Sequence, residues 1–261
     1  MSQADFAMSK IASYGDFGVN LRKLIDYFCH LAVDPSFLKK IKENDPEFNQ
    51  TFYFNKIAWL KDKSDNLYNP SYGDIIRVSF TKEFERGRLS DLVSLLSGRN
   101  FETKTYEQEI QENTFKRLEK SLLEFVNETN FKRFIMIIKS AGFISSELIT
   151  SKMALNFAYI LYLKLREKNY PPEKIEKFVR KWFVMSLLTG RYTGPFESTI
   201  EDDIKRISKN GIEMELKVIE DGELSSAFWE TTLVKELEKS NINNPFINVF
   251  FAAQVKNNDE G

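Results

Sequence analysis

Residues 171–207, PPEKIEKFVRKWFVMSLLTGRYTGPFESTIEDDIKRI, determine the fold class of this chain. The residues that recur at intervals of three and four in its first half indicate a helix with one buried face. Pro171 and Pro172 can begin that helix because a proline in the first turn loses no hydrogen bond. Gly190 can end it in the left-handed conformation. The positions on the predicted buried face are Ile175, Phe178, Val179, Trp182, Phe183, Ser186 and Leu187.

A short turn follows, in which Arg191 and Tyr192 precede Gly194 and Pro195. Ser198 and Glu201 have the spacing of a capping box, in which each side chain bonds to the backbone of the other residue, so we predict that a second helix begins there. The stretch therefore predicts a helix, a tight turn that carries an arginine and a tyrosine, and another helix.

Helical spacing continues through the rest of the chain. A capping box of Ser2 and Asp5 predicts a helix at the N-terminal end, and Ser36 can cap a short helix after Pro35. The stretch 74–84 has strand-like composition, but its ends are those of a helix, and we predict a helix there. The stretch 211–222 fits either structure, and we predict a helix because it has no evident partner strand. Helices are also expected at 20–33, 46–63, 90–98, 106–126, 130–141, 153–168, 224–239 and 245–256, with a short one capped by Ser145 or Ser146. The prediction is an all-α bundle of roughly a dozen helices with short loops.

Length and composition indicate a globular protein of the cytoplasm. The chain has 261 residues, of which 42% are hydrophobic and 14% aromatic, enough for a substantial core. The single cysteine excludes an intramolecular disulfide, and no apolar run approaches the roughly 18 residues of a membrane span. We predict one helical domain over 1–261, cut from a larger protein, with possible lobes at 1–100 and 101–261 separated within 97–107.

Catalytic and metal chemistry have few candidate residues. One histidine and one cysteine cannot form a zinc or HNH-type site. Cys29 and His30 are neighbours, so on a helix their side chains point about 100° apart and cannot form an activated nucleophile pair. Glu201, Asp202 and Asp203 could hold magnesium, but acidic residues in the first turn of a helix more simply complement its dipole. We expect no catalytic residue, metal or cofactor in this chain.

The segment 190–194, GRYTG, permits two interpretations. Glycines let backbone amides approach a phosphate, and an arginine binds phosphate well. However, the segment lacks the Lys-Ser/Thr ending of a Walker loop, and acidic residues follow it. We favour a helix end at which Arg191 pairs with a nearby carboxylate.

Basic residues cluster between positions 164 and 181, where seven basic and three acidic residues give a net charge of +4. Lys174, Lys177, Arg180 and Lys181 are candidate contacts to phosphate or DNA. The usual interpretation of such a run is the solvated face of an amphipathic helix. A second basic group comprises Lys116, Arg117, Lys120, Lys132 and Arg133.

Several stretches resemble the helical region of the domain-of-unknown-function 262 family, which includes the GmrSD-type modification-dependent restriction enzymes. They are RKWFVMSLLTGRYTG (180–194), ESTIEDDIKRI (197–207), SQADFAMSKIA (2–12), SDLVSLLSGRNFETKTYE (90–107) and NNPFINVFFAAQVK (243–256). Family members carry an Asp-Gly-Gln-Gln-Arg nucleotide motif in a preceding domain, and many end in a histidine-rich HNH-type nuclease. Neither motif is present in this chain.

The resemblance implies a non-catalytic helical domain of a restriction or phage-defence protein, which couples a nucleotide domain to DNA binding or cleavage. Its partners would be those two missing domains and DNA, with Arg191 and Tyr192 facing the nucleotide domain. The alternative is a scaffold for protein interaction or homo-oligomerisation without nucleic-acid binding.

Overall fold

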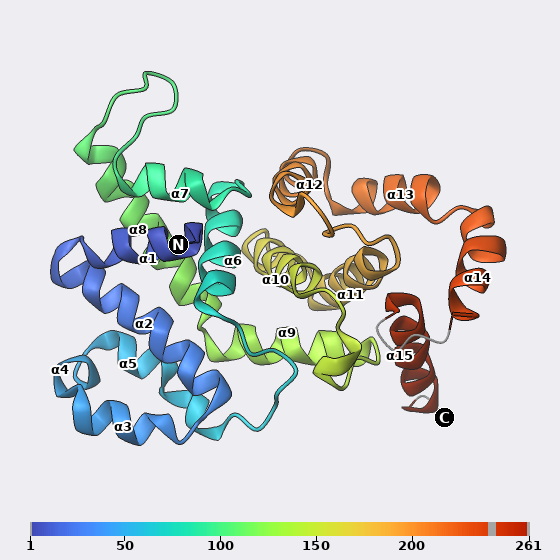
Figure 1. Cartoon of the computed structure of the whole chain (residues 1–261), viewed down its shortest axis with the longest axis horizontal. Coiled ribbons are helices and arrows are strands. Elements are labelled where there is room, and N and C mark those ends of the chain that lie inside the picture. Colours follow the sequence, from blue (N-terminus) through green and yellow to red (C-terminus); the bar gives the residue numbers. More distant parts are fainter. Residues whose placement is uncertain (1, 240–243, 260–261) are drawn as a thin grey trace. The chain divides into compact units, whose positions relative to one another are not determined.

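All regular structure in the described residues, 2–239 and 244–259 of a computed structural model, is helical (Figure 1). No strand forms in these ranges, so the all-α prediction is confirmed. The ambiguous stretches 74–84 and 211–222 both lie in helices, α6 (Tyr72–Phe84) and α13 (Ile212–Glu223). None of the helices in these ranges has the length and apolar character needed to cross a membrane.

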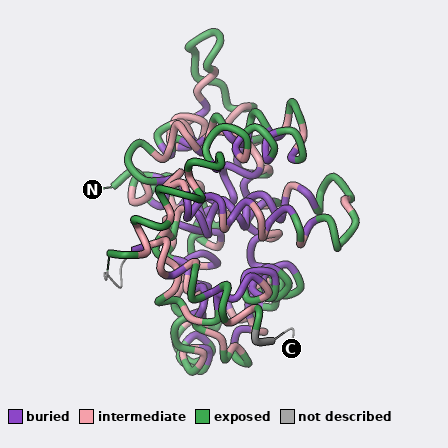
Figure 2. Tube along the Cα trace, turned by 90° about the vertical axis from the view of Figure 1, so that its right-hand side faces the viewer, coloured by how far each residue is buried: buried purple, intermediate pink, exposed green. Residues whose placement is uncertain are grey.

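The chain divides into two compact units, residues 1–132 and 133–261. Helix α9 (Glu128–Ser140) begins in the first unit and ends in the second. The loop 97–107, where the sequence suggested a boundary, lies inside the first unit between α7 (Leu89–Leu96) and α8 (Gln108–Phe125). Its exposed tip projects at the top of Figure 2.

The first unit is built on α1 (Gln3–Ala12), α2 (Gly15–Val33), α6, α7 and α8. Helix α1 packs on α2 and α7, while α6 packs on α8. The aromatic centre of its core is a cluster in which the Phe131 ring stacks on Tyr68, with centroids 5.7 Å apart, and meets Phe28 edge to face. Four short segments follow α2 along the chain: α3 (Phe37–Asn44), α4 (Pro46–Asn49), α5 (Phe52–Ile57) and the 3₁₀ turn η1 (Ala58–Asp62).

Side chains cap the starts of α1, α4, α5 and α6 in this unit, whereas Ser36 makes no side-chain cap at the start of α3. The predicted Ser2–Asp5 capping box is present, and a second box of Ser71 and Asp74 begins α6. The single helix predicted over 46–63 is wrong, because Thr51 accepts a hydrogen bond from the Phe54 N–H and starts a separate helix. Every residue from Asp74 to Lys82 is buried, so α6 lacks the one-sided pattern that marks a surface helix.

The second unit contains α10 (Lys152–Glu167), α11 (Pro172–Leu188), α12 (Phe196–Asn210) and α13. Helix α10 packs on α11 and is buried on most sides. Helix α12 contacts α10 and α13, and α13 also contacts α11. The remaining segments are η2 (Ser146–Leu148), a π-helical turn η3 (Phe228–Thr232), α14 (Leu233–Leu237) and α15 (Pro245–Asp259), which packs on α11. The helix predicted over 224–239 is shorter, spanning 226–237, and contains a π turn.

Candidate functional site

Helix α11 ends in a Schellman motif that fixes the direction of the following turn. The Arg191 N–H donates to the Ser186 carbonyl at 3.1 Å, and the Gly190 N–H donates to the Leu187 carbonyl at 3.3 Å. Gly190 has φ +59°, the left-handed conformation that the sequence predicts for it. This ending points the next two side chains, those of Arg191 and Tyr192, back toward α12.

Arg191 is the centre of an ion-pair network that joins three helices. Its Nε and Nη2 donate to the two carboxylate oxygens of Asp203 on α12, at 2.8 and 2.5 Å. Its Nη1 donates to Glu223 at the end of α13, at 2.8 Å. A bidentate pair holds both partners in one orientation. The arginine therefore fixes the turn after α11 to α12 and α13.

Tyr192 completes the network from the buried side. Its hydroxyl donates to Asp203 at 2.9 Å and accepts a hydrogen bond from Trp182 Nε1 at 3.0 Å. The tyrosine ring lies 5.2 Å from the ring of Phe157 on α10, and only 4% of Tyr192 is exposed. The turn is thus bonded to α11 and α12 and packed on α10.

The surroundings of Tyr192 and Arg191 raise the pKa of both groups. Burial raises the pKa of the Tyr192 hydroxyl well above its ordinary value, and the charge of Asp203 raises it further. Burial by itself lowers the pKa of Arg191, but hydrogen bonding and attraction to Asp203 outweigh that effect and raise it. Neither group can act as a base at neutral pH. This geometry agrees with the favoured sequence prediction, in which Arg191 pairs with a carboxylate of its own chain.

The start of α12 differs from the sequence prediction. The helix begins at Phe196, two residues before Ser198, and no side chain caps it. Ser198 is therefore already helical and donates its hydroxyl to the Pro195 carbonyl, while Glu201 pairs with Lys205. The predicted Ser198–Glu201 capping box is wrong.

The structure does not bring Glu201, Asp202 and Asp203 together as a cluster of potential metal ligands within the described residues. No cluster of three or more potential metal ligands occurs in ranges 2–239 and 244–259. Because α12 begins at Phe196, the triplet also lies beyond the first turn, so complementing the helix dipole does not explain it. Asp203 is buried and bonded to Arg191 and Tyr192 instead.

Most of the candidate basic residues of α11 are paired with carboxylates. Lys174 lies 3.6 Å from Glu213, and Lys181 lies 2.5 Å from Glu220, both on α13. Arg180 pairs within its own helix with Glu176 at 3.3 Å. These pairs reduce the positive charge that α11 can offer to a phosphate.

The α11–α13 pairing was missed from sequence, although a signal was present. Lys174 and Lys181 are seven residues apart, as are Glu213 and Glu220, so each pair lies on one helix face two turns apart. Matching spacings of opposite charge predict adjacent helices. That pattern would have identified α13 as the neighbour of α11.

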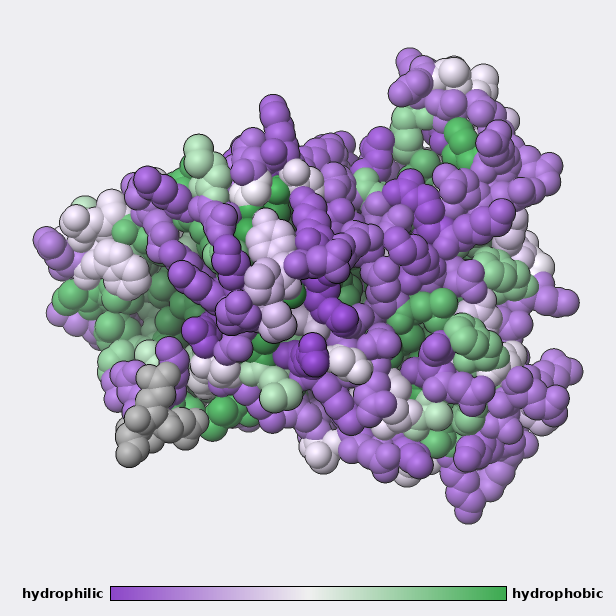
Figure 3. Space-filling view, turned by 180° about the vertical axis from the view of Figure 1, so that it is seen from behind, coloured by the Kyte–Doolittle hydropathy of each residue, from purple (hydrophilic) through white to green (hydrophobic). Residues whose placement is uncertain are grey.

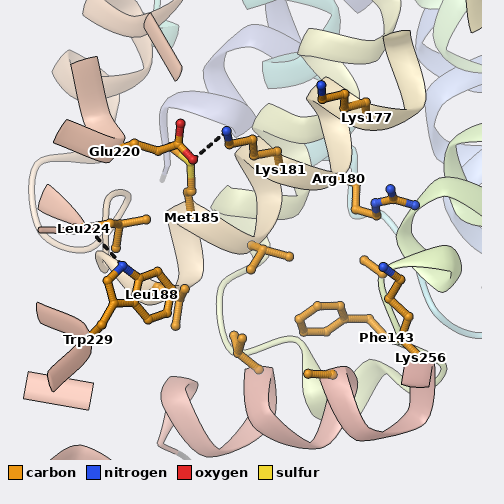
Figure 4. Close-up of a pocket in the computed structure, with 14 residues that line it drawn as sticks. Phe143, Lys177, Arg180, Lys181, Met185, Leu188, Glu220, Leu224, Trp229 and Lys256 are labelled. Carbon is orange, nitrogen blue, oxygen red and sulfur yellow. Dashed lines mark hydrogen bonds and ion pairs between the residues drawn. The ribbon is translucent and has the colours of Figure 1, made fainter. Parts of the chain in front are cut away.

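Three of the candidate residues, Lys177, Arg180 and Lys181, line one pocket of about 410 Å³ (Figure 4). The pocket lies among α11, α13, the η3 region and α15, all in the second unit. Nine of its fourteen lining residues are apolar, four are basic and one is acidic. It brings together part of the predicted basic cluster with apolar residues that the sequence did not connect to it. We call this the α11 pocket.

Two members of the other basic group also pair with carboxylates, and the neighbours Cys29 and His30 lie on α2. In the first unit, Arg117 pairs with Glu83 at 3.0 Å and Lys132 pairs with Glu128 at 2.7 Å. Cys29 is half-buried, and His30 is exposed beside the ring of Phe37, with centroids 4.9 Å apart.

No family model, no curated protein and no solved structure matches this chain.

Proposed function

We propose that this chain is the non-catalytic helical region of a modification-dependent DNA restriction or phage-defence protein, of the kind that its sequence resembles. In this role it couples a nucleotide-handling domain to DNA binding or cleavage. The proposal is supported by the sequence stretches that carry the resemblance and by the network around Arg191. It assigns binding and mechanical coupling, and no bond-making step, to the chain itself.

The observation that carries the proposal is the way Arg191 ties three successive helices together. Its bonds to Asp203 and Glu223 link the end of α11 to the middle of α12 and the end of α13. A displacement of α11 must therefore move α12 and α13 or break charged hydrogen bonds. Connected elements of this kind carry coupling between distant sites when they have two discrete arrangements.

DNA contact would use those basic residues of α11 that face solvent. Lys177 has no ion-pair partner within the described ranges, whereas Lys174, Arg180 and Lys181 are paired. Contacts to phosphate position a protein on a duplex without reading its sequence. The expected binding is weak and strongly dependent on salt.

Fluorescence anisotropy with a labelled DNA duplex tests this contact. We expect affinity that falls steeply between about 50 and 200 mM salt, because phosphate contacts release counterions. Changing Lys177, Arg180 and Lys181 together to Glu should abolish binding. The matched control changes three exposed lysines of the first unit, Lys10, Lys40 and Lys42, to Glu and alters the net charge equally. Equal loss in both variants, or no binding by the unchanged chain at low salt, would refute DNA contact through α11.

A second candidate function, an oligomerisation scaffold, is favoured by the exposed aromatic residues of α15. Phe250 and Phe251 are 46% and 48% exposed, and adjacent exposed phenylalanines are typical of interaction surfaces. A scaffold predicts a molar mass that rises with concentration in multi-angle light scattering and returns to that of the monomer when both residues are changed to Ser. A constant monomer mass over the accessible concentrations excludes homo-oligomerisation through this surface.

A further inference from the structure

The floor of the α11 pocket is apolar and partly uncovered. Met185 and Leu188 of α11 face it from one side, and Phe143, Leu224 and Trp229 line the others (Figure 4). The Trp229 indole N–H is already bonded to the Leu224 carbonyl at 2.9 Å, so the ring offers only its apolar surface. Trp229 nevertheless remains 46% exposed.

Hydrophobic side chains also gather in a hollow on the surface of the α14 and α15 region, at the left of Figure 3. An uncovered apolar hollow with a polar rim is typical of a ligand-binding site. Met185 adds adaptability, because its flexible thioether can adjust to the shape of a ligand. The floor of the α11 pocket therefore fits the apolar part of a ligand.

The rim of the pocket is cationic. Lys177, Arg180, Lys181 and Lys256 line it, with Glu220 as the one lining carboxylate, and Arg180 is also paired with Glu176 outside the lining. Arg180 and Lys256 extend toward the same edge of the pocket from α11 and α15 (Figure 4). Two cations at one edge above an apolar floor favour an anionic group between them.

The size of the pocket fits a small ligand. Its volume of about 410 Å³ lies within the range of roughly 300–1,000 Å³ found for small-molecule sites. Pockets of this kind are mainly apolar and contain a few polar groups that fix the orientation of the ligand.

We propose that the α11 pocket binds a monomeric amphiphilic anion, with its apolar body on Met185, Leu188 and Trp229 and its carboxylate or phosphate head at Arg180 and Lys256. The head also lies within the influence of Lys177, and it competes with Glu220 for Lys181. Because Glu220 and Glu223 lie on the same turn of α13, such competition would act on the helix end that Arg191 holds. The site shares Lys177, Arg180 and Lys181 with the proposed DNA contact, whereas Lys256 and the apolar floor belong to the ligand site alone.

Isothermal titration calorimetry with three twelve-carbon probes tests the site. Dodecanoate and dodecyl phosphate carry the two anionic heads, and dodecanol is the uncharged control; each is used as a monomer in solution. We expect both anions to bind one to one and at least about ten-fold more tightly than dodecanol, because the head gains charge-assisted hydrogen bonds. Equal affinity for all three probes, or no saturable binding, would overturn the proposal.

Variants locate the binding. Ala253 is exposed and lines the pocket, so Ala253→Trp should fill it and abolish binding without disturbing the core. Changing Arg180 and Lys256 together to Gln should weaken binding of both anions about ten-fold and leave dodecanol unchanged. The matched control changes Lys168 and Lys174, which do not line the pocket, to Gln. This variant should bind both anions as tightly as the unchanged chain does. Wild-type affinity in Ala253→Trp would place the ligand elsewhere and refute the site.

Vesicle flotation distinguishes a free amphiphile from a membrane surface. We expect no flotation of the chain with vesicles that contain phosphatidylserine. Flotation that Ala253→Trp leaves unchanged, together with no binding of the monomeric anions, would replace the proposed ligand with a lipid surface.

Discussion

Arg191 binds both carboxylate oxygens of Asp203, twelve residues further along the chain, with Nε and Nη2 at 2.8 and 2.5 Å. Asp203 is 2% exposed and also accepts the hydrogen bond of the Tyr192 hydroxyl. The pair converts a solvent-facing turn into a fixed connection between α11 and α12. It explains why an arginine in a glycine-flanked turn, which suggests phosphate binding from sequence, serves the structure instead.

Removal of Arg191 should strongly destabilise the chain. Arg191→Ala leaves the Asp203 carboxylate buried without its cationic partner, and losing one member of a buried pair costs about 3–5 kcal/mol of unfolding free energy. Urea unfolding followed by circular dichroism measures this loss. Arg206→Ala, at an exposed position of α12, is the control and should stay within about 0.5 kcal/mol of the unchanged chain.

The double variant Arg191→Met/Asp203→Leu separates the charge effect from other causes. Replacing both charges with apolar groups leaves no unpaired buried ion, so we expect most of the lost stability to return. The single variants Arg191→Met and Asp203→Leu each lose unfolding free energy. If the double variant loses the sum of these two amounts, the residues do not act as a pair, and the assignment of Arg191 to Asp203 is wrong.

Loss of the Tyr192 hydroxyl should be destabilising even though the ring remains. In Tyr192→Phe, Trp182 Nε1 loses its acceptor and Asp203 loses a donor, at a cost of about 1–3 kcal/mol. Tyr106→Phe is the matched control because Tyr106 is 66% exposed. Equal urea midpoints for both variants would show that the hydroxyl makes no net contribution.

Gly142 should tolerate no side chain. It has φ +89°, and a Cβ at this position would lie 1.8 Å from the Ala252 carbonyl oxygen of α15. We expect Gly142→Ala to displace α15 and increase hydrogen exchange along that helix. Gly194→Ala has a similar φ of +76° but open space around it, so it measures backbone strain alone. Similar exchange of α15 in both variants would contradict the close approach at Gly142.

Asp45 should make stability depend on pH in acid. Burial raises the pKa of Asp45, but hydrogen bonds from Lys23, Tyr27 and the Phe48 N–H outweigh this and lower the pKa below its ordinary value. The folded state therefore favours the charged carboxylate, whose contribution is complete above the unfolded pKa and disappears as pH falls through the folded pKa. Asp45→Asn should lose about 1–3 kcal/mol at pH 7 and progressively less below about pH 4.

Urea unfolding at pH 7, 5 and 3 measures this dependence. The control is Asp62→Asn, since the Asp62 side chain is 72% exposed and 4.0 Å from Lys61. If the stability difference between Asp45→Asn and the unchanged chain grows on acidification, the pKa of Asp45 is not lowered by folding.

The sequence predicted those parts of the fold that depend on local rules. Helix α11 has a wide apolar face between a double proline and a glycine, and the Ser2–Asp5 box has its own bonding pattern, so both were predicted correctly. The Ser198–Glu201 box failed because the same spacing also occurs inside a helix, where Ser198 bonds to Pro195. Spacing alone does not show where the first turn lies.

The candidate site could be predicted only in part. That Arg191 pairs with a carboxylate follows from its place at a helix end, but several carboxylates follow it, and only packing selects Asp203. The α11 pocket could not be predicted, because Phe143, Trp229 and Lys256 come from segments far apart in the sequence. Their proximity to Arg180 is a result of tertiary structure.

Turnover by the purified chain is the decisive measurement for a domain proposed to couple and not to catalyse. Phosphate release from ATP and GTP with Mg²⁺, and cleavage of unmodified and modified DNA, should not exceed the buffer control. Turnover that purifies with the chain and is lost in Tyr192→Phe, with that variant shown to be folded by circular dichroism, would contradict the proposed role and make the Arg191 turn an active site.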